Sequence, residues 1–146
     1  PHPPVNLEMT MSSPIETVQS AYAAFGRGDI PALLDHLSDD IEWTFDGSTG
    51  DAYMRTARGK DDVMRWFAQV MAVDGIQAFE PRQMLAGRDH VTVIGWERTQ
   101  ALPAGGIFES SWIHVWQLRG DRITRFFGMF DTAAAARARC ATVSGS

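Results

Sequence analysis

One histidine in the second half of the chain is placed to carry a proton. His114 lies within Ile107–Leu118, a run of alternating residues that puts Trp112 and Trp116 on the same face of an expected strand. Free imidazole has a pKa of about 6.5, so it exchanges protons near neutral pH. His114 is therefore a candidate to shuttle a proton or to bind a ligand. The structural alternative is a histidine held between the two indoles for packing.

Arg98 is the second candidate, because a guanidinium offers a rigid fork of donors to a carboxylate, a phenolate or a developing enolate. Alternation along a second strand-like run, residues 90–102, places Arg98, Gln100 and Trp96 on one face, which we expect to line a cavity. Gln100 would then be a hydrogen-bonding wall. The alternatives for Arg98 are an internal ion pair with Asp46 or Glu97, or an exposed edge position.

Two aspartates complete the catalytic candidates. Asp46 ends a short strand beside a loop and could swing over a cavity as a base, although a turn residue before Gly47 is the commoner role. Asp131 follows the last strand and precedes Thr132 and a run of alanines, which is typical of a helix N-cap. Both carboxylates remain open between a catalytic and a structural role.

Large aromatic side chains supply the walls of the expected cavity. The chain has five Trp and eight Phe but two Tyr, and a buried Trp needs a partner for its N–H group. Small-molecule sites combine such apolar walls with a few polar groups. Plain core packing is the alternative. Gly128 would leave room for a ligand, beside the expected walls Tyr22, Trp43, Phe45, Trp66, Trp96, Trp112, Trp116, Phe126 and Phe130.

Helical spacing dominates the first half of the chain. Ser13 and Glu16 form a capping box that opens a helix from Pro14 to the stop at residues 26–28. Asp29 caps a short second helix, which ends at residues 38–40. A short strand at residues 41–46, a polar loop at residues 47–57 and a third helix at residues 59–73 follow.

The second half changes to a period of two residues. Four strand-like runs, separated by glycine-containing turns, cover residues 76–86, 90–102, 107–118 and 122–130. Helices followed by an antiparallel meander are typical of an α+β fold. We expect one sheet with one face covered by helices.

Composition excludes several classes of function. The net charge of −5 and the lack of a basic face argue against nucleic-acid binding. Four scattered His residues and a single cysteine, Cys140, predict neither a metal site nor a disulfide. No glycine-rich phosphate cradle follows a strand, so no cofactor is expected. No long apolar run and no secretory pattern occur, which favours a cytoplasmic protein that does not enter membranes.

Several short motifs together resemble the SnoaL-like branch of the nuclear-transport-factor-2-like superfamily. They occur in the order Val18–Phe25, Gly28-Asp29, Leu37–Trp43, Gly59–Val63, Trp112–Trp116, Gly120–Ile123 and Phe130–Thr132. The resemblance implies a cone-shaped, curved antiparallel sheet that packs on three N-terminal helices and encloses a pocket. It covers residues 14–138, with a flexible arm at residues 1–13 and a flexible tail at residues 139–146. It also implies a homodimer through the outer face of the sheet.

The superfamily includes both enzymes and binding domains, so its fold does not fix a function. Where ketosteroid isomerases carry their helical tyrosine, base aspartate and oxyanion-hole aspartate, this chain matches Ala21, Phe45 and His114. The acid–base array of limonene-epoxide hydrolases is reduced here to Arg98, which argues against that reaction. Polyketide cyclases of the branch leave His114 and Asp131 as candidates.

Three functions remain open. The first is cofactor-free proton transfer on a small, apolar cyclic or aromatic carbonyl compound, in an isomerase, cyclase or dehydratase type of reaction. In that case His114 moves the proton, while Arg98 and Gln100 polarise the carbonyl oxygen. The second is a protein that binds such a compound without catalysis. The third is a structural dimerisation domain whose pocket is filled by its own side chains.

Overall fold

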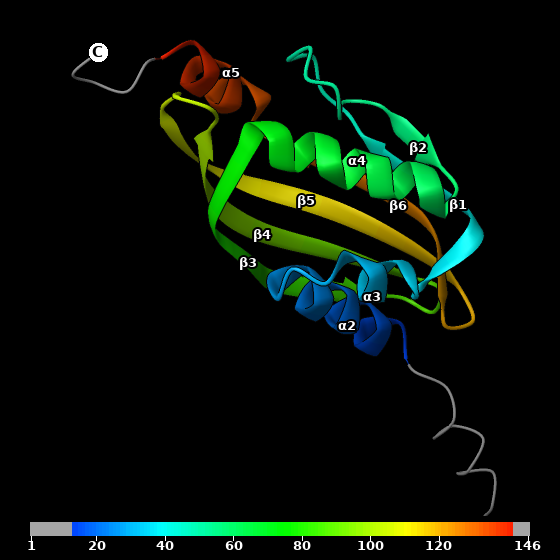
Figure 1. The fold of residues 1–146 in the computed structure, drawn as a ribbon. Coiled ribbons are helices and arrows are strands. Elements are labelled where there is room, and N and C mark those ends of the chain that lie inside the picture. Colours follow the sequence, from blue (N-terminus) through cyan, green and yellow to red (C-terminus); the bar gives the residue numbers. More distant parts are fainter. Residues whose placement is uncertain (1–12, 142–146) are drawn as a thin grey trace, which may run out of the picture.

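A six-stranded sheet organises the chain, and the computed structural model describes residues 13–141. The strands lie in the order β2-β1-β6-β5-β4-β3. Their bounds are β1 Leu37–Phe45, β2 Thr56–Arg58, β3 Asp74–Ala86, β4 His90–Ala101, β5 Ile107–Arg119 and β6 Arg122–Phe130. Figure 1 shows the long strands β3 to β6 side by side, which confirms the predicted meander.

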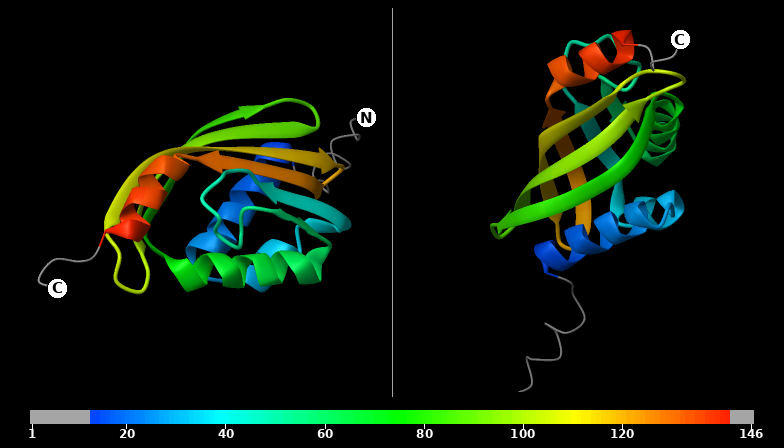
Figure 2. Two further views of the ribbon diagram at one scale, coloured as in Figure 1. Left: turned by 90° about the horizontal axis from the view of Figure 1, so that it is seen from above. Right: turned by 90° about the vertical axis from the view of Figure 1, so that its left-hand side faces the viewer.

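Helices lie on one side of the sheet and at one of its ends. Figure 2 shows the sheet curving over the helices α2 (Pro14–Gly26), α3 (Ile30–Leu34) and α4 (Lys60–Val73). The last helix, α5 (Thr132–Cys140), lies beside the connection between β4 and β5 (Figure 1), where Gly106 donates its N–H group to the carbonyl of Ala138. This is the α+β class that the sequence predicts. No helix within residues 13–141 combines the length and hydropathy needed to span a membrane.

The start of α2 has the predicted capping box. Ser13 Oγ accepts a hydrogen bond from the Glu16 N–H group at 3.2 Å, and Glu16 Oε1 accepts one from the Ser13 N–H group at 3.0 Å. Both bonds satisfy amide groups that have no partner inside the helix. The box fixes the first turn of the helix that carries Tyr22.

Two expectations about the sheet are wrong. The sheet is not wholly antiparallel, because β1 and β6 pair in parallel, with Trp43 opposite Phe126. In addition, β1 begins at Leu37 instead of residue 41, since Leu37 pairs with Ile123 ahead of a register shift. Residues 38–40 therefore belong to a strand and do not end the second helix.

The helix order and the tail also differ from the expectation. Three helices cover the sheet, but α4 follows two strands in the chain, so the three are not all N-terminal. The expected tail begins at residue 139, yet Arg139 and Cys140 belong to α5. The expected arm lies outside the described residues apart from Ser13, and the expected tail lies outside them beyond residue 141.

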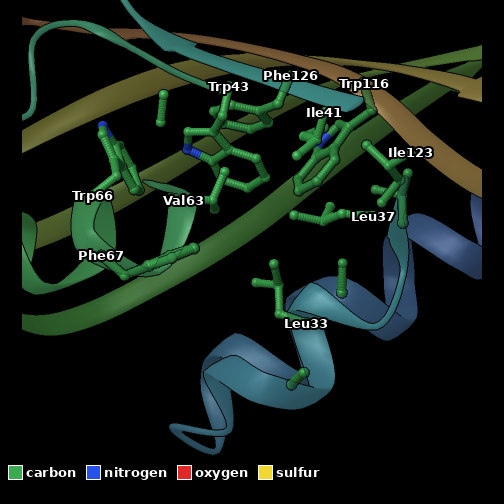
Figure 3. Packing of buried hydrophobic residues seen from close by; sticks show 14 of the residues in the cluster. Leu33, Leu37, Ile41, Trp43, Val63, Trp66, Phe67, Trp116, Ile123 and Phe126 are labelled. Carbon is green, nitrogen blue, oxygen red and sulfur yellow. The ribbon is translucent and has the colours of Figure 1, made fainter. Parts of the chain in front are cut away.

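An aromatic core fills the space between the sheet and the helices. Figure 3 shows Trp43, Trp66 and Phe67 packed together, with Leu33, Leu37 and Ile123 toward the other end. The Trp43 and Phe126 rings stack with their centroids 4.0 Å apart. Each aromatic ring buries a large apolar area, so this cluster supplies much of the driving force for folding.

A glycine in β4 makes room for one of these rings. A Cβ atom added to Gly95 would overlap the indole of Trp112, the residue opposite Gly95 on β5. Trp112 is 1% exposed and cannot move toward solvent. Gly95 is therefore required by packing, because only a residue without a side chain leaves the space that the indole fills.

We expect Gly95→Ala to lower the free energy of unfolding by about 1–3 kcal/mol, the usual cost of overpacking a core. Gly26→Ala is the matched control, because a Cβ atom there has no neighbour within 4 Å. Its position at the end of α2 predicts a gain of up to about 1 kcal/mol. Urea unfolding of both variants measures the difference. Equal stability of the two would contradict the packing of Trp112 against β4.

Candidate active site

An apolar cavity lies between the inner face of the sheet and the helices α2 and α4. It offers about 70 Å³ to the centre of a water molecule. Its walls include polar groups of Tyr53, Asp74, Glu97 and His114. Of the aromatic walls that the sequence predicts, the cavity is lined by Tyr22, Trp43, Phe45, Trp66, Trp116, Phe126 and Phe130.

A chain of hydrogen bonds crosses the cavity wall at His114. Trp116 Nε1 donates to the Tyr22 hydroxyl at 3.0 Å, and that hydroxyl lies 2.7 Å from His114 Nδ1. If Nδ1 carried the proton, the hydroxyl proton of Tyr22 would have no acceptor within residues 13–141. The pattern therefore assigns Tyr22 as donor to Nδ1, and the imidazole proton to Nε2.

Burial keeps this imidazole neutral. His114 is 6% exposed, and burial lowers its pKa from 6.5 to about 3. Burial also raises the pKa of the Tyr22 hydroxyl far above its usual range, so that Tyr22 keeps its proton. A neutral imidazole with a proton on Nε2 can donate a hydrogen bond to a ligand, but it does not pick up a proton at neutral pH.

Stacking holds the ring of His114 in place. The Trp112 and His114 rings are parallel within 20° with centroids 4.0 Å apart, and Phe79 stacks on Trp112 at 4.6 Å. His114 is thus held by packing against Trp112, as the structural alternative predicts, and it also lines the cavity. Trp112, expected as a wall, instead lies behind His114, outside the residues that line the cavity.

Glu97 is a second titratable group of the cavity. This side chain is 8% exposed, and its Oε1 accepts a hydrogen bond from Thr99 Oγ1 at 2.6 Å. Burial raises the pKa of the carboxyl group from 4.5 to about 7, with the nearby charge of Asp74 adding to the shift and the Thr99 hydrogen bond and Arg139 opposing it. Glu97 therefore changes its charge near neutral pH, as a general acid or base must.

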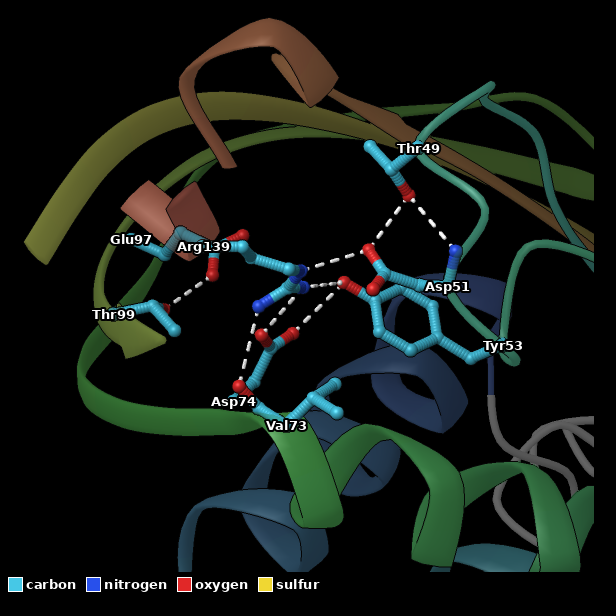
Figure 4. A network of polar contacts seen from close by, with 8 residues as sticks. All are labelled: Thr49, Asp51, Tyr53, Val73, Asp74, Glu97, Thr99 and Arg139. Carbon is cyan, nitrogen blue, oxygen red and sulfur yellow. Dashed lines mark hydrogen bonds and ion pairs between the residues drawn. The ribbon is translucent and has the colours of Figure 1, made fainter. Parts of the chain in front are cut away.

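An ion-pair network lies at the end of the cavity that Glu97 lines (Figure 4). Arg139 on α5 donates to Asp51 Oδ2 at 2.9 Å, to Asp74 Oδ1 at 2.8 Å and to the Tyr53 hydroxyl at 2.9 Å. Tyr53 in turn donates to Asp74 Oδ2 at 2.9 Å. Burial raises the pKa of the Asp74 carboxyl, and the hydrogen bond and charge of Arg139 oppose that shift. The network brings a loop, the start of β3 and the last helix together beside Glu97.

Arg98, Gln100 and Trp96 lie on the opposite face of β4 from the one predicted. Arg98 is exposed and donates to Gln77 Oε1 at 3.0 Å and to Glu109 Oε2 at 3.1 Å, both on neighbouring strands. Arg82 stacks over the Trp96 ring at 4.9 Å. Gly95 lies on the inner face, where Trp112 requires it, so alternation along β4 points Trp96, Arg98 and Gln100 outward. These three residues are not part of the cavity.

The remaining candidates have structural places. Asp131 accepts a hydrogen bond from the Ala134 N–H group at 3.0 Å, so it is the N-cap of α5. Asp46 is exposed after β1 and does not line the cavity. The space above Gly128 is filled by the Phe45 ring, because a Cβ atom there would overlap it. Gly128 thus marks a close approach, but the approach is by Phe45 and not by a ligand.

Four polar residues of this site, Tyr53, Asp74, Glu97 and Arg139, are absent from the sequence-based candidates. Glu97 shares its strand face with Val91 and Val93, and this apolar pattern could have indicated that the face points inward. The prediction that the opposite face lines the cavity left Glu97 out. The others come from a loop, a helix end and an expected tail, and no periodic pattern links them. Within residues 13–141, no group of three or more His, Cys, Asp or Glu side chains could hold a metal ion.

Comparison with known proteins identifies the family. The family model of the SnoaL-like domain matches residues 18–126. The uncharacterized protein Rv0034 of Mycobacterium tuberculosis is 28% identical over 128 residues, which cover 87% of this chain and 95% of that protein. The chain belongs to the SnoaL-like family, as its motifs suggest, and its fold is that of nuclear-transport-factor-2-like proteins.

Solved structures extend this likeness over most of the chain. A protein of unknown function with the nuclear-transport-factor-2-like fold from Burkholderia pseudomallei has 30% identity and a TM-score of 0.80, covering 90% of this chain and all (100%) of that one. TerC, co-crystallised with polyporic acid, has 26% identity and a TM-score of 0.79 over 89% of this chain and 100% of its own. Proteins of this fold thus include one crystallised with a small organic acid.

Proposed function

We propose that the protein is an enzyme that moves a proton on a small, apolar cyclic or aromatic carbonyl compound, in an isomerase, cyclase or dehydratase type of reaction. The observation that carries the proposal is the neutral, buried His114 held by Tyr22 in an aromatic cavity that also contains Glu97. The likeness to TerC, which was co-crystallised with polyporic acid, supports a small organic ligand.

His114 has the role of an electrophile in this proposal. Its Nε2 has no partner within residues 13–141, and its side chain lines the cavity. The N–H group donates a hydrogen bond to the carbonyl oxygen, and the bond strengthens as negative charge develops on that oxygen. Tyr22, whose hydroxyl accepts from Trp116, keeps the proton on Nε2 because it donates its own proton to Nδ1. The proton-shuttle role expected for His114 passes to another residue, since its pKa of about 3 makes it too weak a base.

Glu97 carries the proton in this proposal. Its carboxylate removes a proton from the carbon next to the carbonyl group, and the electron pair of that C–H bond forms an enolate whose oxygen accepts from His114. Glu97 then returns the proton to the same or another carbon, so that no oxidant or reductant is consumed. A carboxyl group with a pKa of about 7 suits both steps, because it neither holds nor releases the proton too strongly.

Hydrogen–deuterium exchange tests this step without knowledge of the natural substrate. Indanone, a small bicyclic ketone, is the probe, and its exchangeable protons lie next to the carbonyl group. In D2O we expect the protein to accelerate their exchange, with a rate that rises as the pH passes through about 7, because Glu97 must be a carboxylate to act as base. Glu97→Gln should reduce the acceleration at least about 100-fold and keep indanone bound.

Arg98→Ala is the matched control, because Arg98 lies on the outer face of the same strand. It should leave the exchange unchanged. Binding of indanone without any exchange would contradict the enzyme and support the binding protein, for which the well-formed stacking around His114 is the favourable observation. No binding of indanone would favour a cavity filled by its own side chains.

We further propose a homodimer that forms through the outer face of the sheet. That face of β4 to β6 exposes the apolar side chains of Ile94, Ile113, Val115, Phe127 and Met129, with Ile113 paired between Ile94 and Met129. An apolar patch of this kind is typical of an interface. Ile113→Glu should convert a dimer into a monomer in sedimentation velocity, whereas Met64→Glu on α4 should not. A wild-type protein that sediments as a monomer would contradict the dimer.

A further inference from the structure

A groove lies next to the cavity, between the end of α2 and the first half of β3. It offers about 530 Å³ to the centre of a water molecule, against about 70 Å³ in the cavity. Five residues line both spaces, and they are Tyr22, Phe25, Asp74, Ile76 and Phe79. The two spaces therefore adjoin at these side chains, which are all that the groove and the cavity share.

Exposed apolar side chains flank this groove. Met71, near the end of α4, is 44% exposed, and Leu102, after β4, is 37% exposed. Leu102 lies over Gly75, where a Cβ atom would meet its Cδ2 atom at 3.3 Å. Most other large exposed apolar side chains of the described residues lie on the sheet strands, away from this groove. Met71 and Leu102 thus leave an apolar surface in water that a ligand can cover.

The charges around the groove exclude an anionic occupant. Its lining contains no lysine, arginine or histidine among the described residues. Asp74 is part of the lining, and its carboxylate already accepts hydrogen bonds from Arg139 and Tyr53. A phosphate or carboxylate in the groove would lie near the carboxylate of Asp74 and would find no cation in the lining to pair with. The remaining walls are apolar side chains, glycine backbone and the amide of Gln77.

We propose that the groove is a second subsite, which holds an uncharged apolar chain attached to the cyclic carbonyl compound in the cavity. This inference rests on the proposed function and names its substrate class more closely. The ring lies against His114, and the chain passes Phe25 and Phe79, whose rings meet edge to face at 5.1 Å. The chain then lies along Met71 and Leu102.

A series of indanones with alkyl chains of increasing length, from methyl to hexyl, tests the subsite. The chain is attached to the benzene ring, on the side away from the carbonyl group. Isothermal titration should show an affinity that rises about two- to threefold per added carbon, somewhat below the gain for a fully buried methylene. Met71→Glu should remove most of this rise and leave the affinity for unsubstituted indanone unchanged, and Met71→Ala should reduce the rise without adding a charge.

Met64→Glu is the matched control, because Met64 lies on the same helix, is 40% exposed and does not line the groove. It should keep the full dependence on chain length. An affinity that is independent of chain length, or an equal effect of Met64→Glu and Met71→Glu, overturns the subsite while indanone binding stands. A failure of indanone itself to bind overturns the proposed function, and the subsite falls with it.

Discussion

The hydrogen-bond chain from Trp116 through Tyr22 to His114 connects the first helix to the middle of the sheet. Its members are far apart in the sequence, and the capping box at Ser13 and the alternation of β5 bring them together. Because Nδ1 accepts the hydrogen bond from Tyr22, the imidazole is neutral and its one proton lies on Nε2. The role proposed for His114 follows from this constraint, since a neutral donor can polarise a carbonyl group but does not remove a proton.

A second set of polar groups complements this donor. Arg139, Asp74, Asp51 and Tyr53 satisfy one another, so the end of the cavity is closed by charges that are already paired. Glu97 stands beside them with one oxygen bonded to Thr99, and its environment brings its pKa to about 7. The pKa shifts in opposite directions, downward for His114 and upward for Glu97, and the proposed function uses this difference to separate the donor from the proton carrier.

The sequence predicts the parts of this arrangement that depend on local periodicity. The spacing of β5 places His114 among aromatic residues on the inner face, and the capping box gives the start of α2. The face of β4 is predicted wrongly, because both of its faces carry apolar residues. Gly95, which must lie under Trp112, decides between them only when the neighbouring strand is in view. Alternation alone consequently predicts Arg98 in the cavity, whereas Glu97 is the residue that lines it.

Contacts between distant segments account for the rest of what the sequence does not reveal. Arg139 contacts Asp74 and Asp51 across separations of 65 and 88 residues. No pattern in the residues around Arg139 predicts a buried guanidinium. The aromatic core contains two buried polar groups that secondary-structure propensities do not predict. The indole N–H groups of Trp43 and Trp112 are buried without an acceptor among the described residues, which costs about 1–3 kcal/mol for each.

The role proposed for His114 depends on its protonation state, which nitrogen-15 NMR of the imidazole measures directly. The account predicts a neutral ring with its proton on Nε2 and no titration of His114 between about pH 5 and 8, since burial lowers its pKa to about 3. In Tyr22→Phe the Nδ1 signal should move, because its hydrogen bond is lost. A ring that titrates near its ordinary pKa, or one that carries its proton on Nδ1, would contradict the account.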